Sequence, residues 1–252
     1  MAGVVLIMGD TGTGKTTSTI INPDGTCDEE FVGIDENGNI KPDNTTYFGM
    51  DPETHFIINL DKKPLPIPGH MWNRKKGNMI STSNFEDIKK ILIWISKNEK
   101  IKSVSLDTLT VYLSIKELNE RKMKTFDTWK DIAQDVIELN DICNTLLRED
   151  QIAYIFGHTT LETNNNTGED IERLSIIGKK LKKTPPEIYY TYTLISRIEW
   201  GEQGDNTHCF ETKADHSTVK VPLGVFKDFR IPNSLKLVDT AVRKHMDRNR
   251  VN

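Results

Sequence analysis

Residues 9 to 16, GDTGTGKT, have the types and spacing of a loop that binds phosphate. They match the Walker A pattern G-x-x-x-x-G-K-[ST] at every position. The three glycines allow the unusual φ/ψ angles and close approach that turn backbone N–H groups onto phosphate oxygens. In this pattern the Lys15 ammonium reaches the β- and γ-phosphates, and the Thr16 hydroxyl is a ligand of Mg²⁺. The residues predicted to bind a nucleotide are Gly9, Asp10, Thr11, Gly12, Thr13, Gly14, Lys15, Thr16 and Thr17.

The same chemistry needs a carboxylate near the metal, and Asp107 has the right position for it. It follows an apolar run, residues 101 to 106, that predicts a buried strand. An acid at the tip of such a strand, downstream of a Walker A loop, is the Walker B pattern, in which the carboxylate holds the Mg²⁺ shell. Thr16 and Asp107 are therefore the predicted metal-binding residues.

The group that activates the attacking water is less well defined. Thr108 follows Asp107, so the Asp-Glu pair of some ATPases is absent. Asp61, after the predicted strand 55–60, is the first candidate, although a turn or cap aspartate fits there equally well. Glu117 is the second candidate. His158, after the predicted strand 152–156, is placed either to sense the γ-phosphate or to serve as an ordinary surface or capping residue.

A parallel sheet would bring these side chains together, because the carboxyl ends of parallel strands meet at one edge. Apolar runs predict strands at 4–8, 55–60, 101–106 and 152–156, and helical periodicity predicts helices at 109–122 and 126–149. A Walker A loop on the first strand, an acid on the third and a polar tip on the fourth form a RecA-like P-loop NTPase core. The expected fold class is α/β, with a mostly parallel sheet flanked by helices.

Other segments complete this picture. Asn22-Pro23 ends the helix after the Walker A loop by residue 21, and Ser83 or Asn84 can cap a further helix. Residues 24–50 predict an inserted surface β-hairpin around Asn37-Gly38, and 162–170 a mobile loop. Residues 189–200 and 208–212 predict an antiparallel hairpin at the C-terminal edge, before a last helix that ends near 245. We expect one domain, residues 1–252.

Two basic segments could contact a polyanion. Lys75 and Lys76 lie near Trp72, a mixture that suits single-stranded nucleic acid, although a solvated loop with a buried tryptophan fits as well. Lys179 and Lys180 belong to a charge run that is either a solvated face, a source of cations for a neighbouring subunit, or a DNA contact.

Composition narrows the class of protein. The 252 residues carry a formal charge of -4, so any contact with nucleic acid must be a local patch. Three widely separated cysteines form no C-x-x-C pair and indicate neither a disulfide framework nor a zinc site. The sequence has no signal-peptide pattern and no apolar stretch long enough for a membrane span. We expect a cytoplasmic protein without a membrane partner, in the host cytoplasm if the gene is of phage origin.

Beyond these motifs, the chain resembles a family of phage-encoded RecA-like P-loop ATPases that are related to single-strand annealing proteins of recombination. The resemblance covers most of the chain outside 24–50, and the segments that carry it are GDTGTGKTTS, DPETHFIINLDKKPLPIPG, SVSLDTLT, IAYIFGHTTLE, LSIIGKKL, FETKADHSTVKVPLGVF and IPNSLKLVD. It implies ATP hydrolysis with Mg²⁺, coupled to the handling of single-stranded DNA in a homo-oligomer. The chain departs from the family at Thr108, where relatives often carry a second acid.

Two functions therefore stand in the foreground. The first is a Mg-dependent ATPase that acts on single-stranded DNA during phage recombination or replication. The second is a binding module gated by ATP with negligible turnover, which the missing acid after Asp107 favours. A small-molecule kinase is a third reading, which the lack of an arginine-rich lid disfavours.

Overall fold

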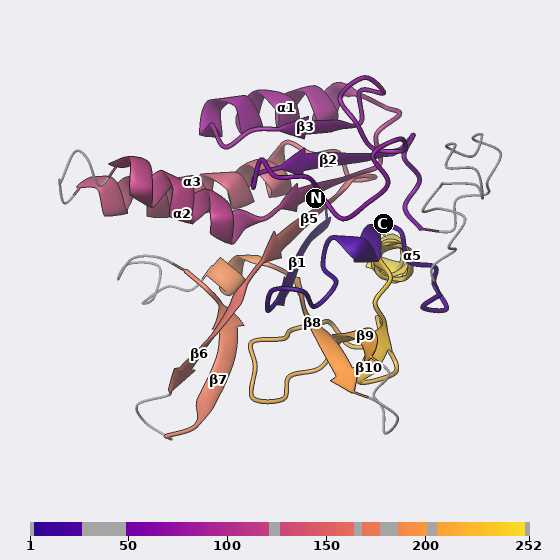
Figure 1. The fold of residues 1–252 in the computed structure, drawn as a ribbon. Coiled ribbons are helices and arrows are strands. Elements are labelled where there is room, and N and C mark those ends of the chain that lie inside the picture. The colour runs from indigo at the N-terminus through magenta and orange to yellow at the C-terminus, as the bar shows by residue number, and fades with distance from the viewer. Residues whose placement is uncertain are drawn as a thin grey trace, which may run out of the picture.

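A central eight-stranded sheet carries the site, with helices on both faces (Figure 1). The computed structural model describes residues 3–26, 49–120, 127–163, 168–176, 186–200 and 206–249. The strand order is β10-β9-β8-β1-β5-β4-β2-β3. The strands are β1 (Gly3–Gly9), β2 (His55–Asn59), β3 (Met79–Ser81), β4 (Ser103–Asp107), β5 (Ile152–Gly157), β8 (Tyr192–Trp200), β9 (Asn206–Glu211) and β10 (Arg230–Pro232).

Six neighbouring strands of this sheet, from β8 to β3, run parallel, and β9 and β10 add antiparallel pairs at one end. The predicted fold class is therefore confirmed, including the antiparallel C-terminal edge. In this order, β5 separates β1, which precedes the Walker A loop, from β4, which ends at Asp107. Since these strands are parallel, their carboxyl ends bring Gly9, Asp107 and Gly157 to the same edge.

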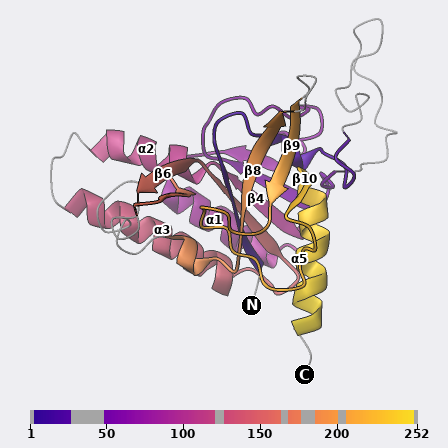
Figure 2. The same cartoon turned by 90° about the horizontal axis from the view of Figure 1, so that it is seen from below.

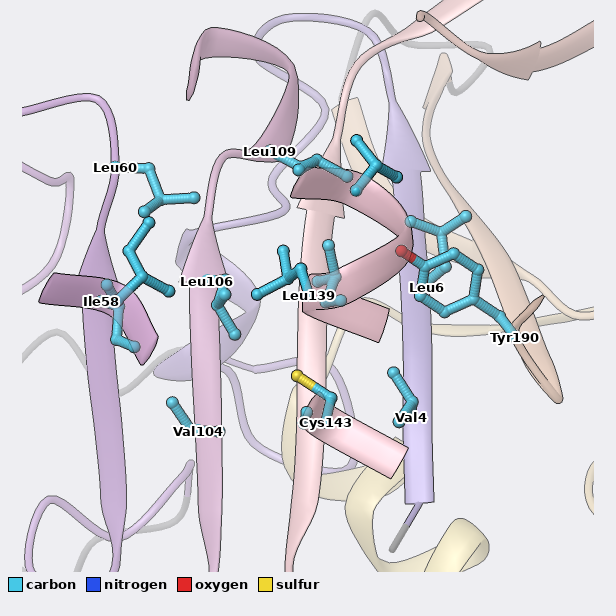
Figure 3. Close-up of a cluster of buried hydrophobic side chains, with 14 of the residues drawn as sticks. Val4, Leu6, Ile58, Leu60, Val104, Leu106, Leu109, Leu139, Cys143 and Tyr190 are labelled. Carbon is cyan, nitrogen blue, oxygen red and sulfur yellow. The ribbon is translucent and has the colours of Figure 1, made fainter. Parts of the chain in front are cut away.

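The helices cover two different faces. Figure 2 shows α1 (Phe85–Lys97), α2 (Leu109–Glu120) and α3 (Asp127–Thr145) on one side of the sheet and α5 (Leu235–Asn249) on the other. Side chains of β1 alternate between these faces, as expected for a strand that is covered on both sides. Leu6 packs toward α3, in the cluster that includes Leu139 and Cys143 (Figure 3), whereas Ile7 belongs to the cluster that contains Val238 of α5.

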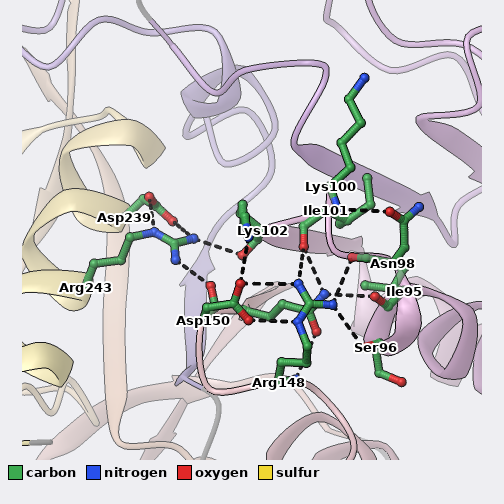
Figure 4. Close-up of polar contacts among 11 residues, drawn as sticks. Ile95, Ser96, Asn98, Lys100, Ile101, Lys102, Arg148, Asp150, Asp239 and Arg243 are labelled. Atoms are coloured by element: carbon green, nitrogen blue, oxygen red, sulfur yellow. Dashed lines mark hydrogen bonds and ion pairs between the residues drawn. The ribbon is translucent and has the colours of Figure 1, made fainter.

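A polar network joins α5 to the amino ends of the strands, at the edge opposite the Walker motifs (Figure 4). Arg243 of α5 donates to Asp150 O at 2.7 Å and Lys102 O at 2.9 Å, and its guanidinium is paired with Asp239. Arg148 donates to Ser96 O at 2.9 Å. These arginines satisfy backbone carbonyls that the ends of helices and strands leave open.

One local prediction was wrong, and a second was wrong at its ends. The helix after the Walker A loop is reduced to a single 3-10 turn, η1 (Thr17–Thr19). Side chains explain this, because the Thr17 and Ser18 hydroxyls donate to Gly14 O and Lys15 O and compete with helical hydrogen bonds. The segment predicted as a loop, 162–170, begins and ends in strands, because β6 (Thr159–Thr163) pairs with β7 (Asp170–Leu174) as a two-stranded sheet. Residues 164–167, between the two strands, lie outside the described residues.

The remaining predictions have mixed outcomes. The other predicted strands and helices are present, and Asn84 is the cap of α1, since its Oδ1 accepts from Asp87 N at 3.2 Å. Most of the predicted hairpin at 24–50 lies outside the described residues. Among the described helices, none has both the length and the apolar composition needed to cross a membrane.

Candidate functional site

A cleft of about 350 Å³ opens at the carboxyl edge of the sheet, where the Walker motifs meet. We call it the P-loop cleft. Its lining comes from the loop after β1, the ends of β2, β4 and β5, and the strand β9. The described lining residues are Thr11, Gly12, Gly14, Lys15, Thr16, Thr17, Asp61, Lys63, Leu65, Pro66, Asp107, Thr108, His158 and His208.

The backbone of the loop has the geometry that its glycines predicted. Gly12 and Gly14 have φ angles of 82° and 94°, a region that favours glycine. The backbone N–H groups of Gly14, Lys15 and Thr16 make no hydrogen bond within the described part of the chain. A row of unpaired N–H groups along a cleft is a site for phosphate oxygens.

The Lys15 ammonium is folded onto its own loop. It donates to Gly9 O at 2.8 Å and to Asp10 O at 2.7 Å, and the residue is only 6% exposed. Burial lowers the pKa of Lys15 from 10.5 to about 8, and the carboxylate of Asp107 opposes this shift. The structure therefore keeps a cation at the wall of the cleft, but one that loses its charge at moderately alkaline pH.

The two residues predicted to hold the metal are in contact. The Thr16 hydroxyl donates to Asp107 Oδ2 at 2.6 Å across 91 residues of sequence. Burial raises the pKa of Asp107 from 3.8 to about 6, and the hydrogen bond from Thr16 opposes that shift. A hydroxyl oxygen beside a carboxylate suits Mg²⁺, which takes one or two protein oxygens and keeps waters and substrate phosphates as its other ligands.

No cluster of three or more potential metal-ligating His, Cys, Asp or Glu side chains occurs within the described ranges. Mg²⁺ would be held here by Thr16 and Asp107 together with phosphate oxygens, because it is usually bound through one or two protein oxygens. When bound, the ion would neutralise charge on the phosphates.

Asp61 lies in the same cleft, at the end of β2. Its Oδ1 accepts from the backbone N–H of Thr108 at 3.0 Å and from the Thr108 hydroxyl at 2.9 Å, while Oδ2 is 2.9 Å from Lys63 Nζ. The side chain is 4% exposed. The structure thus places this carboxylate in the P-loop cleft, next to the end of β4.

His158 also lines the P-loop cleft, directly after β5. Its backbone N–H donates to the Thr110 hydroxyl at 2.8 Å, and its buried Nδ1 has no hydrogen-bond partner in the described residues. Burial, followed by the charge of Lys15, lowers the pKa of His158 below its usual value. A neutral imidazole with an unpaired nitrogen in this cleft is consistent with the predicted sensor, which stays a prediction.

Other predicted residues do not meet here. Glu117 lies on α2 and does not line the P-loop cleft. The Asp10 carboxylate accepts a hydrogen bond from the backbone N–H of Thr11 at 2.7 Å. Asp10 is therefore part of the loop but does not line the P-loop cleft. The two basic segments are also separate from the P-loop cleft or not described. Lys75 and Lys76 are exposed, but Trp72 is 1% exposed and packs in the core, so it offers no stacking surface.

Lys179 and Lys180 lie outside the described residues.

Three residues that contact the loop escaped prediction. Ser196 on β8, His208 on β9 and Asn233 before α5 each lie within hydrogen-bond distance of a loop carbonyl. Ser196 and His208 reach Thr13 O, and Asn233 reaches Gly14 O. The sequence carries no direct signal for these contacts, since the residues lie 183 to 219 positions from the carbonyls.

No protein-family profile and no curated protein matches this chain, whereas solved structures do. Among solved structures, it is similar to a KaiC-like protein, PH0186, from the hyperthermophilic archaeon Pyrococcus horikoshii OT3. The sequence identity is 14% and the TM-score is 0.44, and the match covers 83% of this chain and 77% of that chain. A similarity at this level carries no information on function. The functional proposal therefore rests on the geometry of the site.

The pKa of Lys15 predicts how phosphate binding depends on pH. We expect the affinity for ADP, measured by calorimetry in EDTA, to fall as the pH rises above about 8, because Lys15 loses its charge there. The phosphates of ADP are already ionised over this range, their last pKa being about 6. The free energy of unfolding should instead rise with pH between about pH 8 and pH 10.5, because the unfolded chain binds more protons than the folded chain in this range.

The matched control for this prediction is Lys15→Met, which keeps an unbranched stem and removes the titrating group. Its residual affinity should show no change over the same pH range. An affinity of the unaltered protein that stays constant up to pH 9.5 would contradict the proposed contact between Lys15 and phosphate.

Proposed function

We propose that this chain binds ATP with Mg²⁺ in the P-loop cleft and hydrolyses it, and that it acts on single-stranded DNA in phage recombination or replication. The observation that carries the proposal is the 2.6 Å hydrogen bond from Thr16 to Asp107, in the cleft that also contains Lys15. It joins the Walker A hydroxyl to the Walker B carboxylate, which is the pair that holds Mg²⁺ in P-loop ATPases.

Hydrolysis requires a group that orients water, and Asp61 is the best candidate. It shares the cleft with Lys15, and the Thr108 donors and the Lys63 cation fix its orientation. In the proposed reaction the free N–H groups of the loop and the Lys15 ammonium hold the phosphates. Asp61 then accepts a hydrogen bond from the attacking water, and His158 contacts the terminal phosphate.

The DNA part of the proposal rests mainly on the resemblance to phage ATPases. The exposed cations Arg74, Lys75 and Lys76 support it as phosphate contacts, whereas the buried Trp72 does not add base stacking. A homo-oligomer, with a site completed by a neighbouring subunit, is part of the same proposal.

The test is the rate of ATP hydrolysis by the full chain, with and without Mg²⁺ and with and without a single-stranded oligonucleotide. We expect turnover that requires Mg²⁺, that rises with the oligonucleotide, and that loses this stimulation as the salt concentration increases. Asp107→Asn is the control for contaminating activity, because it keeps the shape of the side chain and removes its charge. Turnover without stimulation, together with salt-insensitive binding, would refute the DNA part alone.

A second candidate is a module that ATP switches without appreciable turnover. The observation that favours it is that Asp61 already accepts two hydrogen bonds and an ion pair, which leaves less of the carboxylate for water. Tight binding of ATP, with turnover no faster than that of Asp107→Asn, would support this candidate over the ATPase.

A further inference from the structure

Two carbonyl groups of the P-loop are contacted by side chains from the last third of the chain. The Ser196 hydroxyl donates to Thr13 O at 2.7 Å, and His208 Nδ1 lies 2.9 Å from the same oxygen. Because a carbonyl can only accept, this contact requires the proton on Nδ1. Asn233 Nδ2 donates to Gly14 O at 2.9 Å. We call these three residues the P-loop brace.

The brace contributes to the direction of two peptide groups. Gly14 O also accepts from Ser18 N at 2.9 Å and from the Thr17 hydroxyl at 3.0 Å, whereas Thr13 O is held by the brace alone within the described part of the chain. The bonds from Thr13 to Gly14 and from Gly14 to Lys15 are trans, and in a planar trans peptide the C=O and N–H groups point in opposite directions. A carbonyl that is held toward the brace therefore turns the N–H of the next residue away from it. Those N–H groups belong to Gly14 and Lys15, which line the P-loop cleft and have no hydrogen-bond partner among the described residues.

We propose that Ser196 and Asn233, with His208, are positioning residues that aim the Gly14 and Lys15 N–H groups at the phosphates of the nucleotide. The proposal rests on the proposed function, since it assumes that the cleft binds phosphate. Without the brace, the Thr13–Gly14 peptide has no donor to its carbonyl among the described residues. A rotated plane there would present a carbonyl oxygen to an anion. If the peptide planes are already held in the free protein, binding does not have to include the entropic cost of ordering them.

The packing around the brace is tight enough to hold it. Ser196 is fully buried and Asn233 is 2% exposed, and Ser196 Oγ lies 3.3 Å from Asn233 Oδ1. A Cβ atom on Gly14 would come within 2.5 Å of Asn233 Nδ2 and 3.0 Å of His208 Nδ1. The loop therefore lies directly against the brace, and Gly14 has no room to move toward it. His208 is exposed, so the buried pair Ser196 and Asn233 gives the sharper test.

The experiment compares Asn233→Ala and Ser196→Ala with the unaltered full chain. Dissociation constants for ADP and for inorganic pyrophosphate are measured by calorimetry, and the ¹⁵N–¹H signals of Gly14 and Lys15 are recorded without ligand. We expect both affinities to weaken about tenfold, by a similar factor for the two ligands because the brace acts on phosphate alone. The amide signals of Gly14 and Lys15 should shift or broaden in the free protein.

Asn78→Ala is the matched control. Asn78 is also a buried asparagine whose Nδ2 donates to backbone carbonyls, those of Pro52 at 3.0 Å and Met71 at 2.8 Å, and it does not line the P-loop cleft. The Asn78→Ala substitution should lower the melting temperature. It should leave the affinities for ADP and pyrophosphate, and the amide signals of Gly14 and Lys15, unchanged. Ser196→Ala keeps the test informative if Asn233→Ala does not fold, because it removes one oxygen atom only.

The outcomes separate this proposal from the proposed function. If the unaltered protein binds ADP and both folded brace variants bind it equally well, the brace has only a structural role and the proposal is wrong. If the unaltered protein binds neither ligand, the proposed function fails. The amide signals still decide the positioning role in that case, since unchanged Gly14 and Lys15 signals in the variants would overturn it.

Discussion

Lys15→Met is expected to weaken the binding of ADP and ATP by about 100-fold or more, to a residual affinity, while the fold persists. The ammonium of Lys15 is the buried cation of the P-loop cleft, and without ligand it is held by Gly9 O and Asp10 O. A charge-assisted hydrogen bond contributes about 1.5–3 kcal/mol, so losing contacts to two phosphates weakens binding by about 100-fold or more. Calorimetry with ADP measures this loss, and circular dichroism verifies the fold.

Lys75→Met is the control for the loss of a positive charge as such. Lys75 is exposed and lies outside the P-loop cleft. It should keep the affinity for nucleotide, even if it reduces the affinity for an oligonucleotide. Binding of ADP by Lys15→Met with the affinity of the unaltered protein would show that the cleft is not a Walker-type phosphate site.

Asp61→Asn is expected to lower kcat for ATP hydrolysis by about 10² to 10⁴, with little change in the affinity for ATP. The amide keeps an oxygen that can accept from Thr108, but it removes the negative charge that would polarise water. It also removes the ion pair with Lys63, whose pKa is raised chiefly by its hydrogen bond to Asp61. Steady-state hydrolysis and calorimetry with a non-hydrolysable ATP analogue measure the two quantities separately.

Glu117→Gln tests the other carboxylate that the sequence offered. Glu117 is on α2 and does not line the P-loop cleft, so turnover should be unchanged. The reverse pattern, with normal turnover in Asp61→Asn and loss in Glu117→Gln, would mean that Asp61 only anchors Thr108. In that case the water-activating acid must be reached by a rearrangement of α2.

Local pattern was enough to predict the main parts of the cleft. Each of Lys15, Asp61, Asp107 and His158 follows an apolar run, and parallel strands necessarily bring such positions to one edge. The same reasoning could not decide whether Glu117 reaches the cleft, because a position on a helix does not fix a direction relative to a distant loop.

The features that the sequence did not predict depend on side-chain hydrogen bonds and ion pairs, which leave no periodic pattern in the sequence. The brace residues lie 183 to 219 positions from the carbonyls they contact, and a side chain that donates to a backbone oxygen leaves no characteristic residue type in the sequence. The strands β6 and β7 were missed because their composition is polar, with an ion pair between Arg173 and Glu162 at 2.9 Å instead of apolar alternation. Hydroxyl groups of Thr17 and Ser18 shortened a helix that the Walker A pattern normally begins.

The position of β1 in the sheet has a consequence for how the protein is made. Its two neighbours, β5 and β8, both come from the second half of the chain, with Val5 opposite Tyr154 on one side and Tyr192 on the other. A nascent chain on the ribosome therefore exposes its Walker A segment long before either neighbouring strand has been translated. We expect the capacity to bind nucleotide to arise only near the end of translation, so a truncated product would carry the motif without the site.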